Sequence, residues 1–123
     1  MIKQIMLVGL GGGAGSILRF LASYFTAKSG NYPFNAATFA VNITGCLLIG
    51  ILTGLALKHN WLDENMRLLL ITGFCGGFTT FSTFSLENMQ MFQSGHYVQL
   101  VIYILTSIIL GFAAVWTGLL LTK

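Results

Sequence analysis

Most of the charged residues of this chain fall between or at the ends of long apolar stretches, and this spacing constrains the fold more than any other feature. Only 7% of the 123 residues are charged, whereas a soluble globular domain carries about 25%. A membrane-spanning helix needs roughly 20 mostly apolar residues. The spacing therefore predicts four spans, at about residues 4–27, 36–57, 66–93 and 97–121, which form one all-α transmembrane domain over residues 1–123.

Short polar connections separate the predicted spans. Gly30 and Pro33, the one proline of the chain, mark a turn before the second span. Asp63 precedes the third span, where its carboxylate is positioned to accept backbone N–H groups of the first helical turn. The net charge of +3 comes from isolated Lys and Arg residues at span ends, so it does not indicate binding to nucleic acid.

The distribution of basic residues gives a weak signal for orientation in the membrane. The residues divide four against two, with Lys3, Lys58, Arg67 and Lys123 on the side of both termini and Arg19 and Lys28 on the other. Orientation follows the excess of Lys and Arg on the cytoplasmic side. A chain with so small an excess is able to insert both ways, and this dual topology would permit an antiparallel dimer.

Glycines recur inside the predicted spans. The first span contains a run of them between Gly9 and Gly15, and the second contains Gly45, Gly50 and Gly54. Small residues let the backbones of membrane helices approach closely. The glycine run of the first span therefore predicts a close contact with another helix.

The third span contains a polar segment, Gly73 to Glu87, that reads GFCGGFTTFSTFSLE. Three glycines, five hydroxyl side chains and one carboxylate lie in it. In hydrocarbon every polar group needs an internal partner, so such a segment is buried in protein or lines a water-filled path. Its glycines and threonines around Gly76 to Thr80 predict a break that separates two half-helices. Transporters use such breaks to aim backbone groups at a bound ion.

Two phenylalanines and one asparagine are candidate ion contacts. Phe81 and Phe84 are three residues apart and share one helix face. The edge of an aromatic ring is positive and is able to stabilise an anion, although ordinary core or lipid-facing rings are the commoner case. Asn42 lies in the middle of an apolar span, where an unpaired amide costs about 2–7 kcal/mol. It therefore either bonds to another helix or faces a polar path, and the sequence leaves both open.

The remaining polar residues form no catalytic constellation, and the chain is predicted not to be an enzyme. Cys46 and Cys75 lie inside predicted spans without metal-ligand spacing and are expected to be small core residues. Arg19 either extends to a membrane interface or attracts anions at a vestibule. Glu87, three residues beyond Phe84, either binds a cation or proton or pairs across an interface.

The segment from Gly76 to Glu87, with the pattern GGFTTFSTFSxE, resembles the signature of the CrcB/Fluc family of fluoride channels. Supporting residues match in the other spans: Gly12 to Gly15 with Arg19, Thr38 to Asn42, Gly73, and Tyr103 with Ser107. The resemblance covers essentially the whole chain. It implies a multi-pass protein of the cytoplasmic (inner) membrane that exports F⁻ passively to relieve its toxicity, built as an antiparallel, dual-topology homodimer in the lipid bilayer.

The resemblance also implies a fluoride pore made of aromatic ring edges, an amide and a track of hydroxyls: Phe81, Phe84, Asn42, Thr38, Ser82, Thr83, Tyr103 and Ser107. Arg19 and Glu87 correspond to charged residues of the family near the vestibule and the end of the motif. A structural Na⁺ at the dimer centre would bind the main-chain carbonyls of Gly76 and Thr79. One departure is Gly111, where the family often has a second serine one turn beyond the first.

Two other functions stay open on the residues alone. The first is a small dual-topology, proton-coupled exporter of cationic drugs. That class needs a membrane-embedded carboxylate, usually in the first span, where this chain has Arg19 and no acid. The second is a purely structural membrane protein, in which Asn42 and the phenylalanines would have no ion-dependent role.

Overall fold

The computed structural model describes residues 1–123, which form helices joined by short turns, without β-strands. Three spans are continuous helices: α1 (Ile2–Ser29), α2 (Ala36–Lys58) and α6 (Tyr97–Leu121). The third span consists of α3 (Glu64–Arg67), the π-helix η1 (Leu68–Cys75), α4 (Gly76–Phe78) and α5 (Phe81–Gln93). Gly30 ends α1 with a φ of 68°, a left-handed conformation that glycine adopts without a steric penalty.

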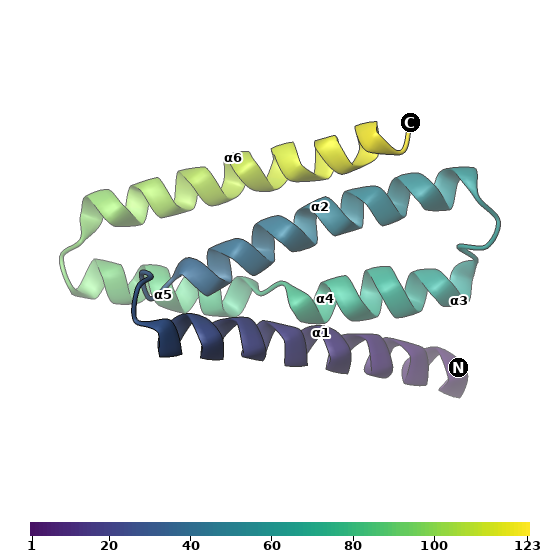
Figure 1. The fold of residues 1–123 in the computed structure, drawn as a ribbon, viewed down its shortest axis with the longest axis horizontal. Coiled ribbons are helices and arrows are strands. Elements are labelled where there is room, and N and C mark those ends of the chain that lie inside the picture. The colour runs from purple at the N-terminus through teal and green to yellow at the C-terminus, as the bar shows by residue number, and fades with distance from the viewer.

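Four helical segments are long and apolar enough to cross a membrane: Ile2–Ser29, Ala36–Lys58, Glu64–Gln93 and Tyr97–Leu121. This confirms the prediction of an all-α membrane protein with four spans. Both chain ends and the turn between α2 and α3 lie at one end of the bundle, and the turns after α1 and α5 lie at the other (Figure 1).

The first residues of the third span agree with the prediction from the sequence, but the helix type that follows them does not. Asp63 caps the span, because its Oδ1 accepts a hydrogen bond from the Met66 N–H at 3.0 Å. The eight residues of η1 then follow with the wider turns of a π-helix, a rare conformation often found at functional sites. Nothing in the local sequence predicts it.

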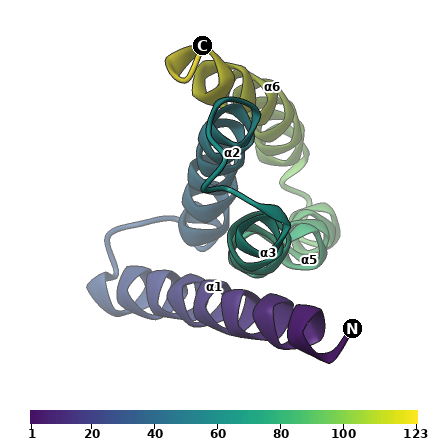
Figure 2. The same ribbon diagram turned by 90° about the vertical axis from the view of Figure 1, so that its right-hand side faces the viewer.

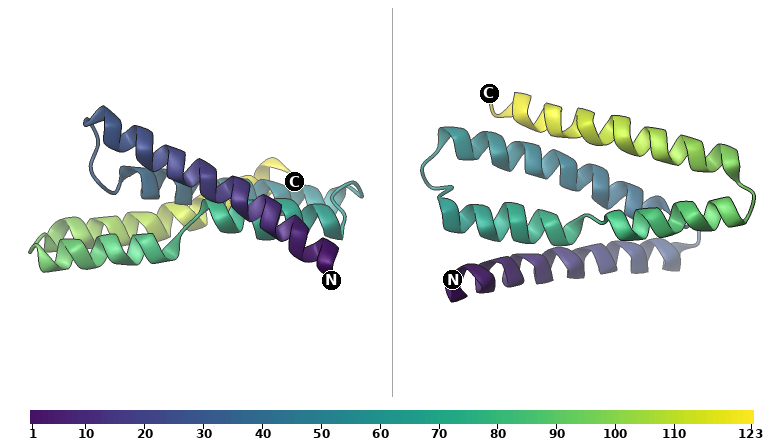
Figure 3. Two further views of the ribbon diagram at one scale, coloured as in Figure 1. Left: turned by 90° about the horizontal axis from the view of Figure 1, so that it is seen from below. Right: turned by 180° about the vertical axis from the view of Figure 1, so that it is seen from behind.

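Glycines bring α1 against the third span. A Cβ atom at Gly11 would meet the Leu69 oxygen and lie 2.8 Å from the Phe74 nitrogen, and one at Gly15 would lie 2.7 Å from the Phe78 nitrogen. Larger residues at these two positions would force the helices apart, so the predicted close contact is confirmed. Helix α1 crosses the third span obliquely (Figure 3, left), on the side opposite α2 and α6 (Figure 2).

A single copy of this chain has little interior. Only 17 of 123 residues are buried, and large apolar side chains such as Phe20, Phe25 and Phe112 remain exposed on α1 and α6. In water such a surface would be strongly unfavourable. The exterior therefore suits contact with lipid chains or with another apolar protein surface.

Candidate functional site

The backbone of the third span leaves helical dihedrals at Thr79 (φ −86°, ψ 161°) and Thr80 (φ −151°, ψ 120°). On the α4 side, the Thr79 N–H and Oγ1 both donate to the Cys75 carbonyl, at 3.1 and 2.9 Å. On the α5 side, the Thr80 Oγ1 accepts the Thr83 N–H at 3.1 Å and caps the helix. The extended residues therefore end one helix and start the next with hydrogen bonds from their own side chains.

Asn42 on α2 pairs with the backbone of Thr80. Its Nδ2 donates to the Thr80 carbonyl at 3.1 Å and its Oδ1 accepts the Thr80 N–H at 2.8 Å. Of the two alternatives that the sequence left open, the bond to another helix is present. The amide has a second N–H that these bonds do not use, and Asn42 also lines a cavity between α2, the third span and α6.

Arg19 on α1 also bonds to the third span. Its Nε donates to the Gly77 carbonyl at 3.1 Å, and the Ser16 Oγ approaches the same oxygen at 3.4 Å. Arg19 and Ser16 are three residues apart and so lie on one face of α1. Gly77 is held close as well, because a Cβ atom there would lie 2.8 Å from the Gly12 Cα.

Glu87 is the centre of a buried polar cluster that joins three helices. Its Oε2 accepts a hydrogen bond from the Thr38 hydroxyl of α2 and its Oε1 accepts one from the Tyr103 hydroxyl of α6, both at 2.9 Å. All three side chains are at most 6% exposed. Each buried hydroxyl therefore has an acceptor, and each carboxylate oxygen has a donor.

Aromatic rings form a row beside this cluster. The ring centroids of Phe81 and Phe84 are 6.0 Å apart, and Phe84 meets Tyr103 edge-on at 5.0 Å with an interplanar angle of 64°. Phe81 is 80% exposed, so nothing in a single copy covers its ring. The row runs from an exposed ring at the start of α5 to a buried hydroxyl on α6.

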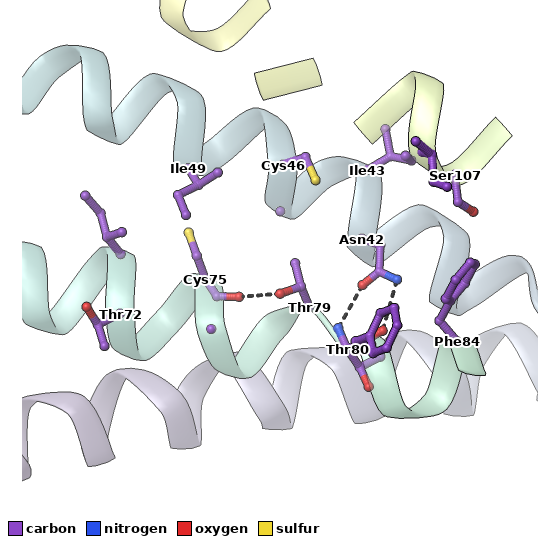
Figure 4. Close-up of a pocket in the computed structure, with 15 residues that line it drawn as sticks. Asn42, Ile43, Cys46, Ile49, Thr72, Cys75, Thr79, Thr80, Phe84 and Ser107 are labelled. Atoms are coloured by element: carbon purple, nitrogen blue, oxygen red, sulfur yellow. Dashed lines mark hydrogen bonds between the residues drawn. The ribbon is translucent and has the colours of Figure 1, made fainter. Parts of the chain in front are cut away.

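A cavity of about 510 Å³ lies between α2, the third span and α6. Polar atoms from the extended segment face it together with side chains of α2 and α6 (Figure 4). The predicted site residues among its lining are Asn42, Gly76, Thr79, Phe81, Phe84 and Ser107. Thr38, Glu87 and Tyr103 lie outside this lining, in the buried cluster.

The other predicted residues lie nearby. The Ser82 hydroxyl is 3.3 Å from the Thr80 Oγ1, and the Thr83 hydroxyl accepts a hydrogen bond from the same oxygen at 3.1 Å. Gly111 on α6 is buried beside Cys46, since a Cβ atom there would lie 3.6 Å from the Cys46 Sγ. This distance is an ordinary van der Waals contact, so the position has room for a serine.

The structure brings two further residues into the site, of which the sequence named Thr80 only as part of the predicted break and did not name Ser16. Thr80 is both the cap of α5 and the partner of Asn42, and Ser16 shares the Gly77 carbonyl with Arg19. For Thr80 a signal was available, because a threonine directly before a helix is a common N-cap. For Ser16 there was none, because its partner is 61 residues away.

These features define a class. A four-span helical membrane protein that keeps an extended backbone segment, an aromatic row and a buried carboxylate between its helices belongs among ion-handling membrane proteins. The model of the CrcB-like protein family, described as Camphor Resistance (CrcB), matches residues 6–119. This chain belongs to the CrcB-like family.

Individual relatives match over nearly their whole length. A protein of Azobacteroides pseudotrichonymphae is 57% identical over 123 residues, which cover 100% of this chain and 98% of the relative. Proteins of Flavobacterium psychrophilum and Phocaeicola vulgatus are 46% and 43% identical over 122 residues, covering 99% of this chain and 98% and 100% of the relatives. All three bear the name Fluoride-specific ion channel FluC.

Proposed function

We propose that this protein is a fluoride channel that lets F⁻ leave the cell passively across the cytoplasmic, inner membrane. The observation that carries the proposal is the aromatic row of Phe81, Phe84 and Tyr103, which lies beside the extended backbone at Thr79 and Thr80. The relatives, whose name is that of a fluoride-specific ion channel, support it. That name also agrees with the prediction that the chain is not an enzyme.

The chemistry of the site suits a small, strongly hydrated anion. Such an ion leaves water only where short, strong donors replace its hydration shell, and hydroxyl and amide groups are donors of this kind. The second N–H of Asn42 and the hydroxyl of Ser107 are available to an ion in the cavity. The positive edges of the Phe81 and Phe84 rings add attraction without a fixed charge that would trap the ion.

The hydroxyls of Thr38 and Tyr103 are committed to Glu87 in this conformation. A fluoride ion that accepts a hydrogen bond from either hydroxyl has to compete with the carboxylate for that hydrogen bond. Glu87 would then act by holding both hydroxyls in place until the ion arrives, and by accepting them again after it leaves. This exchange keeps every donor satisfied in both states, which low-dielectric surroundings demand.

We infer that the working form is an antiparallel, dual-topology homodimer. Phe81 is 80% exposed in one copy. The cavity that it lines is bounded by α2, the third span and α6 of that copy. An aromatic edge can line a closed path only if a second surface covers it, and a second copy supplies the same apolar surface. The four-against-two division of Lys and Arg supports insertion in both orientations.

We infer further that the extended segment at Thr79 and Thr80 acts as the break of a discontinuous helix and holds a structural Na⁺. Both Gly76 and Thr79 line the cavity, and none of the hydrogen bonds outside the helices ends on either carbonyl oxygen. Carbonyls of unwound backbone are common Na⁺ ligands in membrane proteins. When bound, the ion would add positive charge near the path of the anion.

The test is fluoride efflux from liposomes that contain the purified protein, with chloride efflux as the comparison. We expect F⁻ to leave passively in the absence of a proton gradient, which also separates a channel from a proton-coupled drug exporter. Intact dimers without F⁻ flux would refute the channel. Flux that requires an imposed proton gradient would favour the exporter.

A further inference from the structure

The carbonyl groups around the extended segment are divided among different partners. The Gly77 oxygen bonds to α1, the Thr80 oxygen bonds to Asn42 of α2, and the Cys75 oxygen bonds to Thr79. The oxygens of Gly76 and Thr79 accept none of the hydrogen bonds outside the helices. The hydrogen bonds from α1 and α2 therefore engage the carbonyls of Gly77 and Thr80 and not those of Gly76 and Thr79.

The Gly77 oxygen bonds to α1. A carbonyl oxygen has two lone pairs, and here it receives both the Arg19 Nε at 3.1 Å and the Ser16 Oγ at 3.4 Å. The bond from Arg19 is charge-assisted and hence stronger than a bond between neutral groups. The Gly77 oxygen is therefore directed at α1, by a firm bond from Arg19 and a longer contact from Ser16.

The position of Arg19 differs from that of a charge that only faces a vestibule. It is partly buried, and the acceptor of its Nε–H is a main-chain oxygen of the third span, 58 residues away in the sequence. The close approach of Gly12 and Gly77 brings the two backbones near enough for this bond. Arg19 thus acts directly on the backbone of the segment that leads into Thr79.

We propose that Arg19 is a positioning residue for the cation site. By turning the Gly77 carbonyl toward α1, it leaves the carbonyls of Gly76 and Thr79 as the pair that faces the cation. This proposal rests on the Na⁺ site given under the proposed function and adds a residue from α1 to it. The contribution of Arg19 then depends on its Nε–H donor, whereas a vestibule role would depend on its charge.

Three substitutions separate donor from charge. In Arg19→Gln the Nε2 is bonded to Cδ as the arginine Nε is, so the donor to Gly77 is kept and the charge is lost. In Arg19→Met an apolar methyl group takes the position of the arginine Nε, so the donor and the charge are both lost. In Arg19→Lys the charge is kept, but the donor lies one bond farther along the side chain. Ser16→Ala removes only the longer bond and serves as a mild control.

The readout is the rise in melting temperature of the detergent-solubilised dimer as Na⁺ replaces N-methyl-D-glucamine at constant ionic strength. We expect Arg19→Gln to respond at a Na⁺ concentration closer to that of wild type than to that of Arg19→Met, because it keeps a donor to Gly77, although a neutral and weaker one. Arg19→Met should need about tenfold more Na⁺, as the loss of one charge-assisted hydrogen bond implies. Ser16→Ala should shift the midpoint less than Arg19→Met does.

Several results would overturn the proposal. A midpoint for Arg19→Met equal to that of wild type would do so, and so would Arg19→Gln behaving like Arg19→Met. If Arg19→Met does not assemble, Arg19→Gln must still respond at lower Na⁺ than Arg19→Lys, and the reverse order would refute the proposal. A wild-type protein that conducts F⁻ but ignores Na⁺ would remove both the cation site and the role of Arg19, while the channel itself would stand.

Discussion

The side chain of Asn42 pairs with both backbone groups of Thr80, as a neighbouring strand would. The Nδ2 donates to the Thr80 carbonyl at 3.1 Å while the Oδ1 accepts the Thr80 N–H at 2.8 Å. Backbone groups that leave a helix inside a membrane need such partners. The asparagine therefore supports the extended backbone from the second span and at the same time borders the cavity.

Replacing Asn42 should destabilise the extended segment. Asn42→Ala leaves the partly buried Thr80 N–H and carbonyl without partners, at up to about 1–3 kcal/mol for each group. Asn42→Asp keeps the acceptor for the Thr80 N–H but places an oxygen against the Thr80 carbonyl. It should therefore keep the bond to the N–H and lose the bond to the carbonyl. Melting temperature and fluoride flux measured together test this. Unchanged stability in Asn42→Ala would contradict the supporting role.

Replacing the ring of Phe81 or Phe84 should reduce fluoride flux while the protein still assembles. Isoleucine keeps an apolar side chain and removes the positive ring edge, so the flux should fall strongly. Phe84→Ile should also lower the melting temperature, since Phe84 packs edge-on against Tyr103 at 5.0 Å. Phe81→Ile should change the packing within one copy less, because that ring is 80% exposed there. Full flux in both variants would exclude a role for the aromatic edges.

Glu87→Gln should leave the protein nearly as stable as wild type, whereas Glu87→Leu should destabilise it. Glutamine is able to accept the Tyr103 hydroxyl and donate to the Thr38 oxygen, because a hydroxyl both donates and accepts. Glu87→Leu leaves two buried hydroxyls without an acceptor, at about 1–3 kcal/mol each. Thermal unfolding of the two variants makes the comparison. Equal melting temperatures for the two would mean that the hydrogen bonds at 2.9 Å contribute little.

The packing of α1 should depend on which glycine of its run is changed. Gly11→Ala should destabilise the protein by about 1–3 kcal/mol, because the added Cβ meets the Leu69 oxygen and the Phe74 nitrogen. Gly9→Ala is the matched control, since a Cβ there meets no atom within 4 Å. Melting temperatures of the two variants check the expectation. A control as unstable as Gly11→Ala would contradict the packing explanation, because alanine has the higher helix propensity and a Cβ atom at Gly9 meets no neighbour.

A serine at position 111 should be accepted. Its Cβ would lie 3.6 Å from the Cys46 Sγ, so Gly111→Ser adds a hydroxyl one turn beyond Ser107 without a clash. We expect normal assembly and a fluoride flux at least equal to that of wild type. Gly118→Ser is the contrasting variant, because its Cβ would lie 2.6 Å from backbone atoms of α2. Failure of both variants to assemble would show that α6 accepts no side chain along this face.

The sequence by itself determined the spans and the family. The charges mark the ends of four apolar stretches because hydrocarbon excludes unpaired charge, and the helices occupy those stretches. The motif from Gly76 to Glu87 pointed to the family that the family model confirms. Local chemistry was sufficient as well for Asp63, whose cap on Met66 depends on neighbours in the chain.

Only the tertiary structure decided which polar groups meet. Asn42 finds Thr80 across 38 residues, Arg19 finds Gly77 across 58, and Thr38 finds Glu87 across 49. Such pairs depend on how far each helix is rotated and shifted against its neighbours. The glycine contacts and the π-helix η1 set this rotation and shift, and the pattern of residues in one sequence does not encode them. Spacing could therefore place Asn42 and Arg19 in their spans but could not choose their partners. Packing in three dimensions chose them, because each polar group inside the bundle requires a partner within hydrogen-bond reach.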